Sequence, residues 1–258
     1  MKSLPLAALV VLQLALAPIA QAKLSTAESA MAKTVGTEQP RWLALLEKLV
    51  NQNSGSLNLE GVEKVGQMMR AELEPLGFKV EWKPMLDTGR AGHLIATHVG
   101  KPDTKRLLLI AHLDTVFEPD SPFQKFTRLG DMGEGPGAGD DKGGMVVIVA
   151  ALRAMQAAGT LKDANIEIHM TGDEEDSGTP IEKARAALIA AGKRSDIALD
   201  FEGLVRDNGA DMGSVARRSS DSWTVTATGK SAHSSGIFSA AAGDGAIYEL
   251  TRIIHRFP

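Results

Sequence analysis

The chain has 258 residues, of which 43% are hydrophobic and 23% charged, a composition that argues against disorder, collagen and coiled coil. It has no cysteine, which excludes disulfides, thiolate metal sites and cysteine nucleophiles. A net charge of -4 and only 4% aromatic residues argue against a nucleic-acid-binding surface, so no nucleic-acid partner is expected.

The first 22 residues have the pattern of a secretory signal peptide. Lys2 gives a charged start, residues 4–17 are almost wholly apolar, and the small residues Ala20 and Ala22 mark a cleavage site. The apolar run is shorter than the ~20 residues that a membrane-spanning helix needs. We therefore expect residues 1–22 to be removed on export, leaving a periplasmic or secreted protein without a membrane span.

Beyond the leader, helical and strand patterns alternate along the chain. Residues 57–76 repeat apolar side chains at helical spacing, and the nearly continuous apolar run over 106–111 is typical of a strand covered on both faces. The sequence predicts helices over 24–35, 41–51, 57–76, 143–158 and 180–191, and strands over 78–82, 93–98, 106–111, 165–170 and 196–201. This alternation predicts an α/β fold with a mainly parallel sheet flanked by helices.

After residue 210 the sequence pattern changes. The segment 215–228 is polar and β-prone, and the segment 240–256 has a helical pattern. We therefore expect a first domain over 23–210, and over 211–258 the beginning of a smaller α+β domain.

Acidic residues and one histidine follow the predicted strands. His112 and Asp114 come directly after the buried strand, a glycine-rich loop carries Asp140 and Asp141, and further acids occupy 173–176 and 200–202. In an open α/β sheet, ligands bind outside the carboxyl ends of the strands. A ligating histidine usually donates its other ring N–H to a carboxylate, which Asp114 could supply.

Each cluster also has a simpler interpretation. His112 and Asp114 could form an ordinary turn, and the run Asp173–Asp176 could be a solvated acidic loop. The glycine-rich loop is not a phosphate-binding loop, because no Lys-Ser or Lys-Thr pair follows a glycine at the required place. The residues alone leave these alternatives open.

Five short motifs, taken in order, resemble one family. They are AHLDTV at 111–116, GAGDDKGG at 137–144, DEE at 173–175, FE at 201–202 and GKSAH at 229–233. The sequence is similar to the di-zinc metallopeptidases that include glutamate carboxypeptidase, aminoacylase and succinyl-diaminopimelate desuccinylase. The likeness is greatest to the exported glutamate carboxypeptidase branch.

The resemblance implies a role for each motif residue. In the family the bond between the two aspartates of the second motif, here 140 and 141, is cis. The roles implied are zinc ligand for His112, support of that histidine for Asp114, bridge between two zinc ions for Asp140, further zinc ligands for Glu175 and Glu202, and general base for Glu174. On this basis the first domain is the N-terminal part of a catalytic domain.

The second domain is expected to contribute to substrate binding. The resemblance implies that it is a lid and dimerisation domain, in which His233 holds the substrate carbonyl, often across a homodimer; the alternative is a surface histidine. Arg217 and Arg218 could bind a substrate carboxylate, because a guanidinium suits that group, or they could be solvated. The remaining histidines have no motif around them and are expected to be structural.

We therefore expect a zinc-dependent exopeptidase, carboxypeptidase-like, that hydrolyses an amide bond of a small peptide or an N-acyl amino acid. The alternatives are an N-acyl-amino-acid deacylase, an inactive fragment or an exported binding protein. Imidazole and carboxylate ligands also suit Co²⁺ or Mn²⁺. The family uses another histidine ligand far downstream, so this chain is expected to be a fragment with weak or no activity.

Overall fold

The computed structural model describes residues 23–216 and 223–257, and the predicted signal peptide lies outside the described residues. The chain divides into two units, Met1–Asp211 and Met212–Pro258. The division predicted from the sequence is one residue earlier. The assignment of these units as catalytic and lid domains stays a prediction.

Among the described residues, six α-helices lie in the first unit and one in the second. In chain order they are α2 (Thr26–Thr37), α3 (Gln39–Val50), α4 (Leu59–Leu73), α5 (Lys142–Ala157), α6 (Ile181–Ala184), α7 (Ala186–Arg194) and, in the second unit, α8 (Ala246–Ile254). Their starts follow local chemistry: Ser25 and Glu28 form a capping box at α2, and the Asn58 side chain accepts from Gly61 N–H at α4.

The main sheet has five strands in the order β1-β2-β6-β3-β7. Four of them, β1, β3, β6 and β7, run in one direction, and β2 runs against its neighbours β1 and β6. The strands of this sheet are β1 (Lys79–Pro84), β2 (Gly92–His98), β3 (Arg106–His112), β6 (Asn165–Thr171) and β7 (Ile197–Asp200). Two small hairpins are formed by β4 (Thr127–Leu129) with β5 (Met132–Glu134) and by β8 (Val205–Asp207) with β9 (Ala210–Met212).

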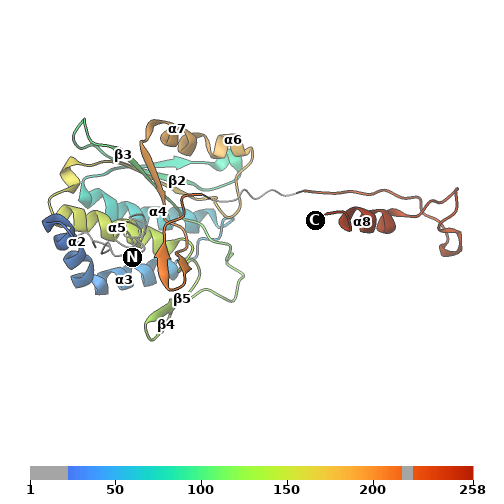
Figure 1. Cartoon of the computed structure of the whole chain (residues 1–258), viewed down its shortest axis with the longest axis horizontal. Helices are drawn as coiled ribbons and strands as arrows, with labels where there is room; N and C mark the ends of the chain where they lie inside the picture. Colours follow the sequence, from blue (N-terminus) through green and yellow to red (C-terminus); the bar gives the residue numbers. More distant parts are fainter. Residues whose placement is uncertain (1–22, 217–222, 258) are drawn as a thin grey trace, which may run out of the picture. The chain divides into compact units, whose positions relative to one another are not determined.

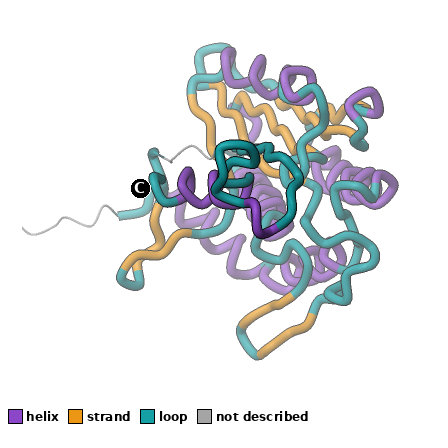
Figure 2. Tube along the Cα trace, turned by 90° about the vertical axis from the view of Figure 1, so that its right-hand side faces the viewer, coloured by secondary structure: helices purple, strands orange, loops and turns teal. Residues whose placement is uncertain are grey.

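Helices cover both faces of the main sheet. The helices α4 and α5 pack on one face, with α2 and α3 beside α5, and α7 packs against β3 from the other face (Figure 1). Within the first unit, the strands in orange lie between purple helices on both sides (Figure 2). The predicted α/β fold with a mainly parallel sheet is confirmed.

The core lies between the sheet and the helices α3, α4 and α5. Alternate residues of β6, Ile166, Ile168 and Met170, face this core together with Met69 and Ile148, and all five are buried. The opposite residues of β6 therefore face α6 and α7, since side chains alternate along a strand.

Some predicted elements differ from the structure. The helix predicted over 180–191 is two helices that meet at Arg185, and the second continues through Gly192 to Arg194. The β-prone segment 215–228 forms no strand in its described parts, residues 215–216 and 223–228. The predicted helix over 240–256 is shorter, Ala246–Ile254, since the residues before it form turns around Gly243 and Gly245, both with positive φ. No helix of the described residues is long and apolar enough to cross a membrane.

Candidate metal centre

The strand register brings three acidic loops to one edge of the sheet. His112 ends β3 opposite Thr171, the last residue of β6, and Ile110 of β3 lies opposite Asp200, the last residue of β7. Because β6, β3 and β7 are parallel neighbours, the loops that follow them emerge side by side. The chain thus places residues 112–114, 173–175 and 201–202 together.

Three side chains at this edge form a group that could hold a metal ion. The Nε2 atom of His112 lies 2.7 Å from Oδ1 of Asp140 and 3.8 Å from Oε1 of Glu202. One ligand atom from each residue lies within 4.8 Å of the other two. One imidazole and two carboxylates are a donor set that suits zinc and also other divalent ions, so the residues present fit a metal.

The surroundings of the His112 ring favour this role. Its Nδ1 lies 3.0 Å from the backbone carbonyl oxygen of Asp114, and a carbonyl can only accept. Nδ1 therefore carries a proton, and Nε2 faces Asp140 and Glu202. Burial alone would lower the pKa of His112, but the surrounding carboxyl groups, Asp114 first, raise this pKa to about 10. A cation at Nε2 would take the place of a proton.

The carboxylate of Asp114 joins the β3 loop to the β6 loop. It is fully buried, and its Oδ1 accepts from the backbone N–H of Glu174 at 3.0 Å while its Oδ2 accepts from the N–H of Glu175 at 3.1 Å. Oδ1 also lies 3.4 Å from Nδ1 of His112. Although burial opposes ionisation, hydrogen bonds from His112 and Ser56 lower the pKa of Asp114. Asp114 therefore holds the backbone at Glu174 and Glu175 in place as well as the ring of His112.

The two aspartates at the start of α5 have different surroundings. Asp140 is exposed beside His112, and the peptide bond that joins it to Asp141 is cis. Asp141 is buried, and its Oδ2 accepts from the backbone N–H of His112 at 3.0 Å. Burial raises the pKa of Asp141 to about 8. Its Oδ1 has no hydrogen-bond partner among the described residues.

The two glutamates after β6 lie beside the group without joining it. Glu174 is exposed and lines a hollow of about 350 Å³ together with His112 and Glu202. Glu175 is half-buried, and burial, followed by the nearby charge of Asp140, raises its pKa. Glu175 is not in the group of three with ligand atoms within 4.8 Å of one another, so its predicted role as a ligand stays a prediction.

Sequence reasoning did not identify Arg185, which supports this loop. Arg185 donates to Oδ1 of buried Asp173 at 2.5 Å and to Oγ of Ser177 at 2.8 Å. His93 is buried beside them and lies within 3.0 Å of the carbonyl oxygen of Ala184. Asp173 belongs to the acidic run that the sequence displays, whereas no sequence signal singles out Arg185 or His93.

The predicted substrate-binding residues lie in the second part of the chain. Arg217 and Arg218 are outside the described residues. His233 is exposed, and its Nδ1 accepts from the backbone N–H of Ser235 at 3.2 Å. It belongs to the second unit, so its role at the substrate stays a prediction.

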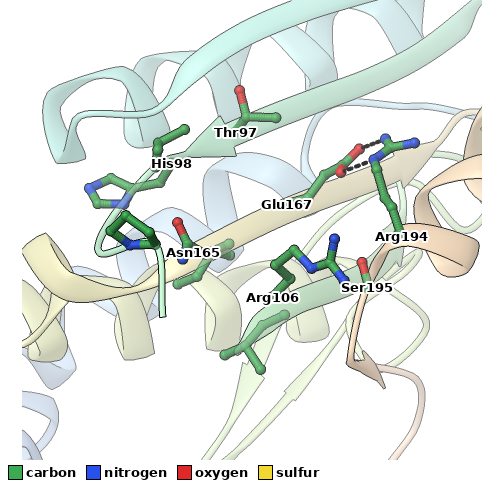
Figure 3. Close-up of a pocket in the computed structure, with 11 residues that line it drawn as sticks. Thr97, His98, Arg106, Asn165, Glu167, Arg194 and Ser195 are labelled. Atoms are coloured by element: carbon green, nitrogen blue, oxygen red, sulfur yellow. Dashed lines mark hydrogen bonds and ion pairs between the residues drawn. The ribbon is translucent and has the colours of Figure 1, made fainter. Parts of the chain in front are cut away.

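A second hollow, of about 310 Å³, lies at the other ends of β3 and β6 (Figure 3). Glu167 and Arg194 line it and form an ion pair with each other, drawn as dashed lines. Arg106, also labelled, pairs with Asp196. Among the described residues no metal-binding group is found there, so the candidate chemistry lies at the opposite edge of the sheet.

Comparisons with known proteins place the chain among its relatives. The sequence profile described as "Peptidase family M20/M25/M40" matches residues 108–249. Carboxypeptidase G2 of Pseudomonas sp. (strain RS-16) is 32% identical over 166 residues, which are 64% of this chain and 39% of that protein. Succinyl-diaminopimelate desuccinylase of Leptothrix cholodnii is 27% identical over 202 residues, 74% of this chain and 51% of that protein. The chain thus spans about two fifths to one half of the length of these relatives.

Solved structures share the fold. Human carnosine dipeptidase 1 matches with a TM-score of 0.57 and 18% identity, over 69% of this chain and 41% of that one. The di-peptidase Dug1p of Saccharomyces cerevisiae matches with a TM-score of 0.56 and 16% identity, over 67% and 40%. At these identities the likeness establishes the fold alone.

Proposed function

Because the chain belongs to peptidase family M20/M25/M40, as its motifs predict, we propose that it is a zinc-dependent hydrolase of amide bonds. The proposed substrate is a small peptide or an N-acyl amino acid. The relatives are named as a carboxypeptidase, a desuccinylase and dipeptidases, which favours an exopeptidase that acts on small substrates.

One observation carries this proposal: His112, Asp140 and Glu202 converge at a sheet edge where Glu174 lines the same hollow. The first three residues would hold zinc, with Glu175 and Asp140 serving a second ion. Co²⁺ or Mn²⁺ would suit the same donors. When bound, such ions would polarise the scissile carbonyl and acidify a water molecule.

The side chains divide the remaining work. Glu174 is exposed at the hollow, and as general base it would take a proton from the attacking water and return it to the leaving amine. Asp114 would keep the proton of His112 on Nδ1 and hold the two glutamate amides in place. A free carboxylate serves better as base than a ligated one, which separates the role of Glu174 from that of Glu175.

Three further features belong to the proposal. Export to the periplasm or beyond rests on the signal-peptide pattern of residues 1–22. Substrate binding by His233, Arg217 and Arg218, and a homodimer that would bring His233 to a neighbouring site, rest on the family resemblance. A deacylase of N-acyl amino acids would use the same centre, so only a panel of substrates separates it from a peptidase.

The test replaces Glu174 by Gln and Glu202 by Gln in the chain from residue 23 onward. The unaltered protein should bind zinc and hydrolyse, at a low rate, members of a panel of dipeptides and N-acyl amino acids. Glu174→Gln should keep zinc and lose ~100-fold or more in turnover, whereas Glu202→Gln should lose zinc affinity. Glu182→Gln, on an exposed acid of α6, is the matched control and should change neither.

The alternatives predict other results. Zinc binding without hydrolysis of any panel member would favour the inactive fragment. Tight binding of a small solute without zinc would favour an exported binding protein. Unchanged zinc affinity in Glu202→Gln would contradict the proposed metal centre.

A further inference from the structure

A short segment before α4 is clamped to the strand end that carries the metal-centre residues. The backbone N–H of Thr115 donates to Ser54 O at 2.9 Å, and the N–H of Ser56 donates to Thr115 O at 3.2 Å. Gly55 and Thr115 form a parallel bridge. Residues 54–56 are thus fixed beside the residue that follows Asp114.

Ser56 uses this position to reach Asp114. Its side chain is buried, and its Oγ lies 2.7 Å from Oδ2 of Asp114. An ionised carboxylate can only accept, so Ser56 donates. The residue is held on its other side as well, because Leu57 N–H donates to Oε1 of Glu118 at 3.0 Å and Asn58 caps α4.

The contacts of Asp114 divide evenly between its two oxygens. Oδ1 receives the amide of Glu174 and faces Nδ1 of His112, and Oδ2 receives the amide of Glu175 and the hydroxyl of Ser56. A carboxylate can rotate about its Cβ–Cγ bond, and rotation would exchange or release the two amides. The hydroxyl of Ser56 is the side-chain donor on the Oδ2 side among the described residues, so it resists this rotation.

We propose that Ser56 is a positioning residue of the metal centre. By holding the carboxylate of Asp114 in one orientation, it keeps the amides of Glu174 and Glu175 in register with the two oxygens. Ser56 touches neither substrate nor metal in this role. Its effect on turnover rests on the proposed function, whereas its effect on the 174–175 loop does not.

The test compares Ser56→Ala with Ser54→Ala. Ser54 precedes Gly55 and is buried like Ser56, but its Oγ has no hydrogen-bond partner among the described residues. Removal of the Ser54 hydroxyl is therefore a matched control. Amide hydrogen exchange is followed in the metal-free protein. Ser56→Ala should speed exchange ~10-fold in peptides covering residues 172–176 and leave the β1–β2 ladder unchanged, while Ser54→Ala should change neither.

The enzymatic consequence is measured separately. Loss of a residue that supports a metal ligand typically costs ~10–100-fold in metal affinity or activity, so kcat of Ser56→Ala should fall within this range while KM stays near that of the unaltered protein. Should Ser56→Ala fail to fold, Ser56→Cys replaces it, because a thiol of similar size is only a weak donor.

The outcomes separate the two proposals. Faster exchange at 172–176 in a protein that shows no hydrolysis would support the role of Ser56 and contradict the proposed function. Exchange and kcat both unchanged in an active protein would overturn the role of Ser56. Equal acceleration across the whole sheet would also overturn it, since that result describes a general loss of stability.

Discussion

At the residue scale, the candidate metal centre is a cluster of carboxyl groups around one buried imidazole. His112 is 1% exposed and lies within 4 Å of carboxylate oxygens of Asp114, Asp140 and Glu202. Burial raises the pKa of Glu202, and the nearby charge of Asp140 raises it further; a cation would offset this repulsion. These carboxyl groups lie in loops, where the backbone is held by the side chains of Asp114 and Asp141.

Arg185 should be among the strongest single contributors to stability. It pairs with Asp173, which is fully buried, through a guanidinium nitrogen at 2.5 Å, and a second nitrogen reaches Asp173 O at 2.8 Å. Arg185→Ala would leave a buried charge without its partner, at a cost of ~3–5 kcal/mol in the free energy of unfolding. Urea unfolding measures it.

The control for Arg185→Ala is a substitution in an exposed ion pair. Arg206 and Asp211 lie 2.7 Å apart with side chains 68% and 61% exposed, and Arg206→Ala should cost less than ~1 kcal/mol. Arg185→Lys should recover only part of the loss, because one ammonium cannot reproduce the two-nitrogen contact. Equal effects of Arg185→Ala and Arg206→Ala would contradict the prediction.

Two buried histidines should make the fold sensitive to acid. His93 donates from Nε2 to Ala184 O and accepts Gly172 N–H at Nδ1. His169 contacts Glu167 through Nε2, and its buried Nδ1 has no hydrogen-bond partner among the described residues. Burial lowers the pKa of both rings. Their neutral forms are therefore the ones that fit the fold.

The sign of the pH effect follows from this shift. A histidine with a lowered pKa in the folded state binds its proton more readily when unfolded, so stability falls as pH drops through the unfolded value of about 6.5. Urea unfolding at pH 7, 6 and 5 should show this loss, and His169→Gln should make the dependence shallower. His255→Gln, at an exposed position, should leave the slope as it is.

At the element scale, α5 is tied to the site by a close approach at its first turn. A Cβ atom at Gly144 would lie 2.0 Å from the carbonyl oxygen of Phe201 and 2.1 Å from Oδ1 of Asp141. The loop after β7, which carries Glu202, therefore rests directly on the backbone of α5. Only glycine permits this contact.

Gly144→Ala should separate these two elements. Overpacking of this kind typically costs ~1–3 kcal/mol, and here it should also weaken zinc binding, because Asp140 and Glu202 flank the contact. The free energy of unfolding and the zinc dissociation constant are measured together. Gly36→Ala in α2, where a Cβ would meet nothing within 4 Å, should instead stabilise by up to ~1 kcal/mol. Destabilisation by both variants would contradict the steric argument.

The elements that the sequence predicts well are those that its periodicity defines. The strand predicted over 106–111 is β3, Arg106–His112, and the helix predicted over 143–158 is α5, Lys142–Ala157. The helix predicted over 180–191 fails at Arg185, because this residue is recruited to Asp173 and Ser177. That demand comes from the tertiary structure, which no local pattern contains.

The candidate site likewise contains residues that the sequence reveals and one that it does not. His112, Asp140 and Glu202 are visible in the sequence, because acids and a histidine follow apolar strands and their motifs occur in family order. Ser56 is invisible, since it lies 58 residues from Asp114 and a serine in a loop has no distinguishing signal. Contacts between distant loops require the register of β3 with its neighbours.

At the scale of the whole molecule, the buried residues all belong to one unit. Every buried side chain among the described residues lies between Trp42 and Ala191, within the unit Met1–Asp211. The family profile, by contrast, matches residues 108–249 and thus continues into the second unit. The buried residues that stabilise the fold therefore end at Ala191, whereas the match to the family profile extends to residue 249.

This difference predicts that the first unit folds without the second. Ending the chain at Asp211 removes no buried side chain of the described residues, so the hydrophobic contribution to folding should be retained. Circular dichroism should give the chains 23–211 and 23–258 melting midpoints within ~4 °C, the shift expected for about 1 kcal/mol or less. The shorter chain should also keep its zinc affinity, because His112, Asp140 and Glu202 all precede residue 211. A broad, non-cooperative transition in chain 23–211 would show instead that residues 212–258 are needed to complete the fold.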